Sequence, residues 1–312
     1  MTLLADVPHI ALPDYAAGGA RRAGFVDALF DGLTRTGFVI LVDHGISEDL
    51  LERAYAASET FFALPDAAKR AYIVGEGRQR GYTPFGEEHA KDSAAPDLKE
   101  FWHVGRETAG RPDLAGVYAP NVWPEEITDF MPAMLGLYDG LERAGLTLLQ
   151  ALTGPLDLPA DYFDAIARDG NSILRLLHYP PIPEGADPAS VRAAAHEDIN
   201  LITLLVAASA SGLELKDHEG RWRPIAAPRN AIIADAGDML ARITGRRIPA
   251  TTHRVVNPTG PNVSRYSAPF FLHPRPDAVL SRIPSCRDLE PVEADITADD
   301  FLKERLREIG LL

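Results

Sequence analysis

Two histidines and an aspartate carry the strongest chemical signal in the chain. His196 and Asp198 are separated by one residue, and His253 follows further along. In an extended segment, alternate residues point to the same face, so one short stretch can present an imidazole and a carboxylate together. Two imidazoles and one carboxylate leave half of a metal's coordination sphere open, which suits non-haem Fe(II) with a chelating co-substrate and O2. Taken alone, a His-x-Asp triplet is more typical of a solvated turn before a buried strand.

A second polar pair lies on a later, largely apolar segment. Arg265 and Ser267 are again separated by one residue, so both side chains can face one cavity. The planar fork of an arginine binds a carboxylate at two points, and a serine hydroxyl can add a third hydrogen bond. Because a buried arginine without an anion is costly, the pair predicts either a carboxylate ligand or a structural Arg–Asp ion pair.

The composition is that of an acidic globular protein. The chain has 312 residues, 46% of them hydrophobic, and a formal net charge of −14, which argues against nucleic acids and anionic membranes as partners. No apolar run is long enough to cross a bilayer, and the first residues do not resemble a signal peptide. The single cysteine, Cys286, excludes an intramolecular disulfide and fits a reducing cytoplasm, which is the location we expect.

The first part of the chain alternates helical and strand patterns. Residues 20–35 predict an amphipathic helix, and residues 37–42 predict a strand. Ser47 is expected to be the N-cap of a helix that runs to about residue 63, because acidic residues occupy its first turn.

The remaining segments of the chain differ in composition and in hydrophobic pattern. Residues 75–125 are rich in glycine, proline and aromatic residues, which favours loops and short strands, and residues 126–168 have a helical pattern. From about 171 to 271, short strands alternate with turns, including a hairpin turn at 217–220, and this is typical of a sandwich or barrel. Residues 302–312 predict a short terminal helix.

Seven ordered motifs resemble those of one enzyme family. They are GFVILVDHGI at 37–46, LHYPP at 177–181, HEDINLITLL at 196–205, GLELKDHEGRWRPI at 212–225, DAGDML at 235–240, THRVVNP at 252–258 and RYSAPFF at 265–271. In this order the chain resembles the isopenicillin N synthase-like family of 2-oxoglutarate/Fe(II)-dependent oxygenases over nearly its whole length.

The resemblance implies a mainly β fold with flanking helices around a distorted double-stranded β-helix, or jelly-roll, core. It also implies a division of the chain into four parts. Residues 1–115 would be an N-terminal non-haem dioxygenase region whose helices and strands complete the barrel, and residues 116–168 would be helical support. Residues 169–275 would form the Fe(II)/2-oxoglutarate oxygenase core, followed by a C-terminal extension at 276–312. The N-terminal region would lie over the mouth of the barrel.

The resemblance further assigns roles to individual residues. The ligands of Fe(2+) would be His196, Asp198 and His253. The groups that bind the C5 carboxylate of the co-substrate 2-oxoglutarate would be Arg265, Ser267 and Tyr179. The expected contacts of the prime substrate are Arg175, Tyr82, Phe85, Trp102, Asn200 and Phe271.

Two departures from the family pattern affect the pocket. Leu177 stands where plant members carry asparagine, and Ile199-Asn200 replaces a small or glycine-containing pair, so Asn200 is expected to approach the metal cavity. Arg175 is the expected contact for an anionic group of the substrate. The histidines that we expect to be structural or exposed are His44, His178, His218 and His273.

The implied activity is the oxidation of a small molecule by O2 and 2-oxoglutarate, with release of succinate and CO2. Hydroxylation, desaturation, cyclisation and ethylene formation all remain open, as does the oligomeric state. Alternatives are a 2-oxoglutarate-independent oxidase of the isopenicillin N synthase type and a non-catalytic ligand-binding relative. Two histidines and an aspartate would also suit a zinc hydrolase, but such an enzyme would not need the Arg-x-Ser pair.

Overall fold

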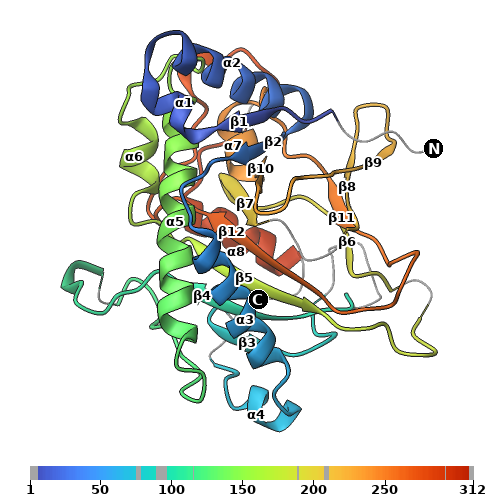
Figure 1. Ribbon diagram of the computed structural model, residues 1–312. Helices are drawn as coiled ribbons and strands as arrows, with labels where there is room; N and C mark the ends of the chain where they lie inside the picture. Colours follow the sequence, from blue (N-terminus) through green and yellow to red (C-terminus); the bar gives the residue numbers. More distant parts are fainter. Residues whose placement is uncertain are drawn as a thin grey trace.

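Two facing β-sheets and the helices around them make up the architecture (Figure 1). The computed structural model describes residues 6–74, 79–88, 97–114, 116–187, 190–206, 211–291 and 293–308. Among those residues, every helix is too short or too polar to span a lipid bilayer.

The larger sheet contains eight strands. They are β1 (His9–Ala11), β2 (Phe38–Val42), β3 (Gly81–Thr83), β4 (Glu100–Gly105), β5 (Ile173–Tyr179), β7 (Ile202–Val206), β10 (Ile232–Ala236) and β12 (Arg265–Leu272). Their spatial order is β1-β2-β10-β7-β12-β5-β4-β3. β1 runs parallel to β2, and the other neighbours are antiparallel.

The smaller sheet contains four antiparallel strands in the order β6-β11-β8-β9. They are β6 (Ala193–His196), β8 (Leu213–Lys216), β9 (Trp222–Pro224) and β11 (His253–Val255). The predicted turn at 217–220 connects β8 to β9. Gly220 donates its N–H to the carbonyl oxygen of Asp217 at 2.8 Å and has φ of 77°, a left-handed conformation that glycine adopts readily.

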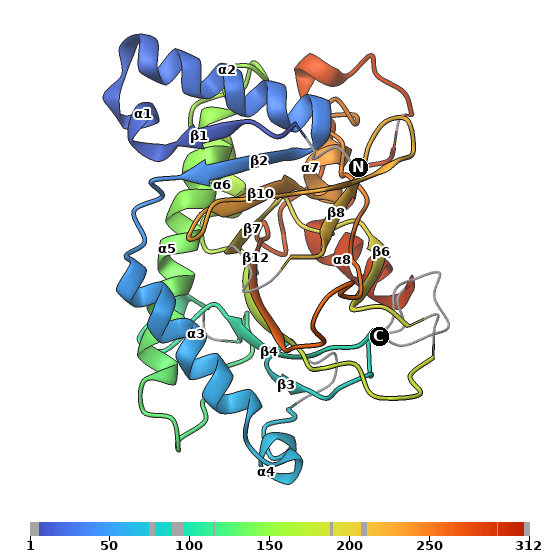
Figure 2. The same ribbon diagram turned by 45° about the vertical axis from the view of Figure 1, so that its right-hand side comes forward.

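Most helices pack on the outer face of the larger sheet, away from the smaller one (Figure 1). The α-helices of the described residues are α1 (Leu12–Ala17), α2 (Gly19–Thr36), α3 (Glu48–Phe62), α4 (Asp66–Arg70), α5 (Phe130–Ala151), α6 (Tyr162–Ala167), α7 (Asp238–Ile243) and α8 (Ala298–Glu308). The long helix α5 contacts β5, β7 and β12. Helix α8 is the exception, because it lies between β12 and β6 at the open end of the two sheets (Figure 2).

Side-chain alternation along the strands separates two apolar cores. On β5, Leu174 and Leu176 pack with the helices, whereas Leu177 and Tyr179 pack between the two sheets. Arg175 is separated from Leu177 by two positions and from Tyr179 by four, so its side chain also points into the space between the sheets. That space therefore holds apolar side chains at one end and polar ones at the other.

The sequence predicted this jelly-roll architecture, and several local elements are confirmed. Ser47 caps α3 by accepting a hydrogen bond from the N–H of Leu50, as its position predicted. The N-terminal 115 residues supply β1 to β4, which complete the larger sheet on both sides of the later strands. The terminal helix begins earlier than expected, at Ala298, and residues 309–312 lie outside the described part of the chain.

Candidate active site

Three metal-binding side chains converge at one end of the smaller sheet. His196 ends β6, Asp198 follows it, and His253 opens β11 directly opposite His196 in the strand pairing. The Nε2 atoms of His196 and His253 lie 3.7 Å and 3.8 Å from Oδ1 of Asp198. Within the described ranges, this is the one group of three or more His, Cys, Asp or Glu side chains that could share a metal ion, with ligand atoms within 4.8 Å of one another.

Backbone carbonyls determine which nitrogen of each histidine faces the metal position. Nδ1 of His196 lies 2.7 Å from the carbonyl oxygen of Ala194, and Nδ1 of His253 lies 3.1 Å from that of Thr251. Because a carbonyl oxygen can only accept, each Nδ1 carries the proton and each Nε2 keeps a lone pair on the side of Asp198. Burial and the neighbouring His253 lower the pKa of His196 to about 4, so its imidazole is neutral at pH 7, as metal binding requires.

Backbone contacts fix the turn that carries Asp198. Its carbonyl oxygen accepts a hydrogen bond from the N–H of Asp238 at 2.7 Å, and the N–H of Gly237 donates to Leu201 at 3.1 Å. A Cβ atom on Gly237 would lie 2.3 Å from the carbonyl oxygen of Asn200, so the two segments approach this closely only because residue 237 is glycine. The start of α7 therefore supports the ligand turn from outside the metal position.

The carboxylate of Asp198 is also supported by side chains. The hydroxyl of Thr203 donates to Oδ2 of Asp198 and accepts from Nδ2 of Asn200, the latter at 2.8 Å. Asn200 is fully buried and does not line the cavity described below. It therefore lies behind Asp198, whereas the sequence led us to expect it against the substrate. Burial and the charge of Asp198 raise the pKa of the nearby Asp235 well above its usual range.

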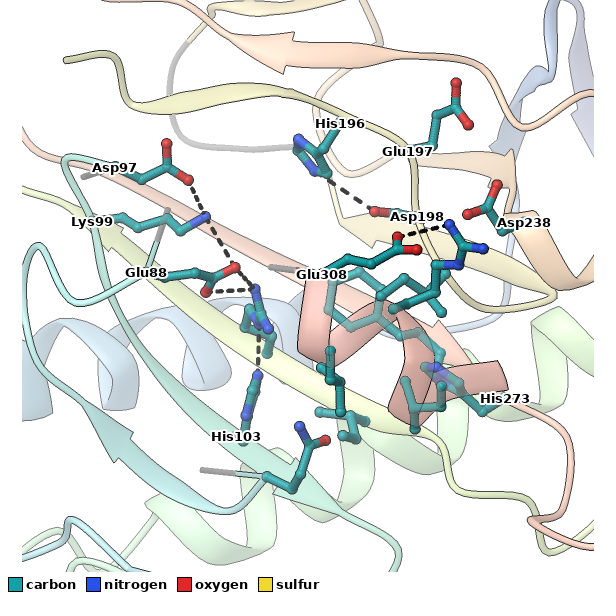
Figure 3. A pocket seen from close by; sticks show the side chains of 18 of the residues that line it. Glu88, Asp97, Lys99, His103, His196, Glu197, Asp198, Asp238, His273 and Glu308 are labelled. Carbon is teal, nitrogen blue, oxygen red and sulfur yellow. Dashed lines mark hydrogen bonds and ion pairs between the residues drawn. The ribbon is translucent and has the colours of Figure 1, made fainter. Parts of the chain in front are cut away.

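A cavity of about 430 Å³ adjoins the metal-binding side chains, and His196 and Asp198 line it (Figure 3). Its size is within the range of small-molecule sites, which is about 300 to 1,000 Å³. The apolar part of its wall includes Ile173, Phe271, Leu302 and Leu306. The polar part includes Glu88, Asp97, Lys99, His103 and Arg175.

The charges of the polar wall balance one another (Figure 3). Arg175 donates to both carboxylate oxygens of Glu88 at 3.2 Å, and its Nε donates to Nε2 of His103 at 2.6 Å. Nζ of Lys99 lies 2.8 Å from Asp97 and 3.6 Å from Glu88. Burial alone would raise the pKa of Glu88, but Arg175 and Lys99 outweigh burial and lower it to about 2. Two cations therefore face two carboxylates.

The arginine–serine pair lies deeper between the sheets, on β12. Arg265 is 1% exposed, and its guanidinium carbon lies 5.0 Å from the ring centre of Tyr179, its partner residue on β5. A second arginine, Arg192, is 2% exposed and donates to the carbonyl oxygen of Val263 at 2.6 Å. Burial and the charge of Arg265 lower the pKa of Arg192. Two neighbouring buried cations form a site that suits an anionic co-substrate.

Two family models match the chain. Residues 7–126 match the N-terminal region described as non-haem dioxygenase in morphine synthesis, and residues 170–274 match the 2OG-Fe(II) oxygenase superfamily. The chain belongs to the 2-oxoglutarate/Fe(II)-dependent oxygenases. The second match contains all three metal-binding residues and both members of the Arg-x-Ser pair.

Known proteins resemble this oxygenase over most of its length. The 2-oxoglutarate-Fe(II) type oxidoreductase hxnY of Emericella nidulans is 30% identical over 93% of this chain and 86% of its own. A 2OG-Fe(II) oxygenase family protein from Caulobacter crescentus has a TM-score of 0.87 and 40% identity, covering 98% of this chain and 99% of its own. A full-length Neurospora crassa protein, solved in complex with alpha-ketoglutarate (2-oxoglutarate) and thymine, has a TM-score of 0.86 and 29% identity, covering 98% and 99%.

These matches establish the enzyme class. The protein is an oxidoreductase that uses Fe(II) and 2-oxoglutarate to oxidise a small molecule. The donor set agrees, because two imidazoles and a carboxylate are the ligands of such iron enzymes. A 2-oxoglutarate-independent oxidase and a non-catalytic relative are not favoured.

Three expected substrate contacts lie elsewhere in the oxygenase. Tyr82 and Trp102 are buried at 1% and 0% exposure on the outer face of the larger sheet, where both rings contact Phe61. Phe85 is 39% exposed and does not line the cavity. Neighbouring residues of a strand point to opposite faces, so His103 lines the cavity and Trp102 does not.

Arg175 and Phe271 both line the cavity. The guanidinium carbon of Arg175 lies 5.3 Å from the ring centre of Phe271. Arg175 was expected to contact a substrate anion, but its charge is already matched by Glu88. The pairing joins residues far apart in the sequence, which is why the sequence pattern did not reveal it.

Histidines outside the metal group divide into two kinds. His178 and His44 are structural, as expected, because they bond to Glu100 at 2.7 Å and to the carbonyl oxygen of Asn230 at 2.6 Å. His273 was expected to be structural or exposed, yet it lines the cavity. It follows Phe271 by two residues, so strand periodicity was the signal that could have placed it there.

Proposed function

We propose that His196, Asp198 and His253 hold Fe(II) and that the prime substrate binds in the adjoining cavity. The observation that carries this proposal is that two of the three metal-binding side chains line a 430 Å³ cavity. Three protein donors leave room on the metal for a chelating co-substrate and O2, whereas a site closed by four protein donors would not.

The co-substrate site is proposed to be the buried region around Arg265. The guanidinium of Arg265 and the hydroxyl of Ser267 would bind the C5 carboxylate of 2-oxoglutarate, with Tyr179 beside them. Arg192, which the sequence did not single out, would add a second positive charge. The burial of two neighbouring arginines supports this role, because their positive charges would attract a dicarboxylate and hydrogen-bond to it.

Together with O2, the bound iron and 2-oxoglutarate supply the oxidising power, and the co-substrate leaves as succinate and CO2. The protein residues position the substrate and exclude water from it. Phe271 and the leucines of α8 would do the latter, because they form an apolar wall. Hydroxylation, desaturation and cyclisation all share this arrangement.

The prime substrate is proposed to be a single small molecule and not a polymer. The Neurospora crassa relative binds thymine, a single ring. A cavity of 430 Å³ admits a molecule of that size but not a folded chain or a duplex.

The experiment that tests the proposed function measures succinate. Metal-free protein is reconstituted with Fe(II) and exposed to 2-oxoglutarate and O2, and succinate is quantified by mass spectrometry. We expect Fe(II)-dependent succinate release that is lost in Asp198→Ala and retained in Asp113→Ala, whose exposed carboxylate bonds Arg111 and does not line the cavity. Equal release by both variants would refute the metal assignment.

The arginine assignment gives a separate prediction. Arg265→Gln should weaken 2-oxoglutarate binding by about 10- to 100-fold, because a charge-assisted hydrogen bond is worth about 1.5 to 3 kcal/mol. Isothermal titration calorimetry with Mn(II) in place of Fe(II) measures the affinity without turnover. Arg275→Gln, at a partly exposed position, is the control. Unchanged 2-oxoglutarate affinity in Arg265→Gln would show that the C5 carboxylate does not bind at Arg265.

We propose a cytoplasmic location on two grounds. Fe(II) must remain reduced, and the single cysteine, Cys286, is a buried free thiol, which suits a reducing compartment. Fractionation of expressing cells tests this, and recovery of the protein outside the cytoplasmic fraction would contradict it.

A further inference from the structure

His273 directly follows β12 and lines the cavity next to the metal-binding side chains. Figure 3 shows its ring beside helix α8, with Asp198 on the other side of the cavity. The side chain is 8% exposed. His273 is neither part of the metal group nor part of the Arg265 region, so iron and 2-oxoglutarate binding leave its position unexplained.

A backbone carbonyl determines which ring nitrogen of His273 carries the hydrogen. Nδ1 lies 3.2 Å from the carbonyl oxygen of Phe271, and because that oxygen only accepts, Nδ1 carries the proton. Burial lowers the pKa of His273 to about 4, so the ring does not take a second proton at pH 7. Nε2 therefore presents a lone pair and can only accept a hydrogen bond.

None of the residues that the structure describes is a hydrogen-bond partner of that lone pair. Nε2 of His273 is buried, and among the described residues it makes no hydrogen bond. Buried polar atoms are nearly always bonded, so a bare acceptor needs an explanation. His196 and His253 have the same arrangement, with Nδ1 on the carbonyl two residues earlier, and their Nε2 atoms face the metal position. His273 has the same Nδ1 contact and lines the cavity, so a donor that is bound there and reaches Nε2 would satisfy it.

The cations of the cavity wall are already matched. Lys99 pairs with Asp97, Arg175 with Glu88, and Arg305 bonds Glu308 at 2.8 Å. A carboxylate or phosphate on the substrate would compete with the wall carboxylates for the same cations, whereas a neutral carbonyl can accept from one of their N–H groups while the pairs stay in place. The wall therefore disfavours a ligand that carries its own carboxylate or phosphate.

We propose that Nε2 of His273 accepts a hydrogen bond from an N–H of the prime substrate, and that this substrate is an uncharged cyclic amide or imide. The inference rests on the proposed function and deepens it. The N–H would face His273, the ring carbonyl would accept from the Lys99 and Arg175 side, and a flat face would rest on Phe271. Such a molecule would satisfy the acceptor, the donors and the apolar wall together.

The test is a binding experiment on the full chain, loaded with Mn(II) and saturating 2-oxoglutarate. The probes are thymine, uracil and 2-pyridone, their N-methyl derivatives, benzoate as an acid and benzylamine as an amine. Isothermal titration calorimetry is performed on wild type, His273→Phe, His273→Asn and His273→Gln. The glutamine amide oxygen can reach the place of Nε2, whereas asparagine can replace only Nδ1, so these two variants are matched.

We expect at least one uncharged N–H ring to bind wild type more tightly than benzoate or benzylamine. Methylation of the ring nitrogen that faces His273 should weaken binding about tenfold in wild type and His273→Gln. The same methylation should change the binding affinity little in His273→Phe and His273→Asn, because these variants already lack the acceptor at the position of Nε2. Comparing the effect of methylation across the variants isolates the contact between the N–H and residue 273. Equal methylation penalties in all four proteins would overturn the role of His273.

Two further outcomes are informative. Preferential binding of benzoate or benzylamine, or failure of every uncharged N–H ring to bind, would overturn the substrate class. Neither outcome touches the proposed function, which stands or falls on Fe(II)-dependent succinate release. Unchanged 2-oxoglutarate affinity in His273→Phe shows that the variant is folded, and His273→Gln provides the conservative rescue.

Discussion

At the scale of single residues, the two oxygens of Asp198 have different surroundings. Oδ1 lies on the side of His196 and His253, while Oδ2 accepts a hydrogen bond from Thr203. A metal ligand that is held in this way keeps its orientation when the metal is absent. The site therefore depends on a residue that does not touch the metal.

Thr203→Val tests this dependence, since valine has the same shape without the hydroxyl. We expect Fe(II) affinity to fall about 10- to 100-fold, the usual cost of losing a partner of a metal ligand. Anaerobic competition with a chelator measures the affinity. Thr60→Val is the control, because the Thr60 hydroxyl bonds only the carbonyl oxygen of Ala56 in its own helix. If both variants bind iron equally well, the Thr203 hydroxyl does not orient Asp198.

The buried His273 predicts a pH dependence of stability. Its pKa is lowered by burial to about 4 in the folded protein, against about 6.5 when unfolded. Because the unfolded chain binds the extra proton first, this residue destabilises the fold progressively as the pH falls from 6.5 to 4. The free energy of unfolding of metal-free protein, measured by urea denaturation, should therefore fall less over this window in His273→Gln than in wild type. Parallel curves would show that His273 is not buried neutral.

Residue spacing predicted the metal group but not every pocket residue. His196, Asp198 and His253 carry their signal in local order, and the structure brings them together. Trp102 was misassigned because a one-residue difference in strand register exchanges the two faces, and the sequence does not give that register. The pairing of Arg175 with Glu88 was not predicted because it depends on tertiary contact.

At the scale of elements, the turn between β10 and α7 supports the Asp198 turn. Gly237→Ala would place a Cβ 2.3 Å from the carbonyl oxygen of Asn200, so the two segments would have to separate. We expect a loss of stability of about 1 to 3 kcal/mol together with weaker Fe(II) binding. Gly154→Ala is the matched control, because a Cβ there meets nothing within 4 Å. Thermal unfolding and iron titration check both effects, and identical behaviour of the two variants would contradict the account.

Helix α8 shows what an amphipathic pattern can and cannot predict. The sequence indicated a terminal helix at 302–312, and the observed helix buries Phe301, which precedes that range, and Leu306, which lies within it. It did not indicate that Leu302 and Leu306 would line the cavity, because a helical pattern gives an apolar face without naming what covers it.

At the scale of the whole molecule, early and late parts of the chain interleave in one sheet. β2 pairs with β10, and β4 pairs with β5, so strands of the N-terminal 115 residues flank those of the oxygenase core. β4 also contributes His103 to the cavity wall. The family resemblance implied that strands of the N-terminal region complete the barrel, whereas the strands that they join are known only from the strand pairing.

The central claim is that His196, Asp198 and His253 form one Fe(II) site next to the substrate cavity. Anaerobic titration of Fe(II) into metal-free protein with saturating 2-oxoglutarate tests it most directly. We expect one Fe(II) per chain in wild type and loss of that stoichiometric binding in His253→Ala, whereas His218→Ala, at an exposed turn, should behave as wild type. Stoichiometric iron binding that survives in His253→Ala would contradict it.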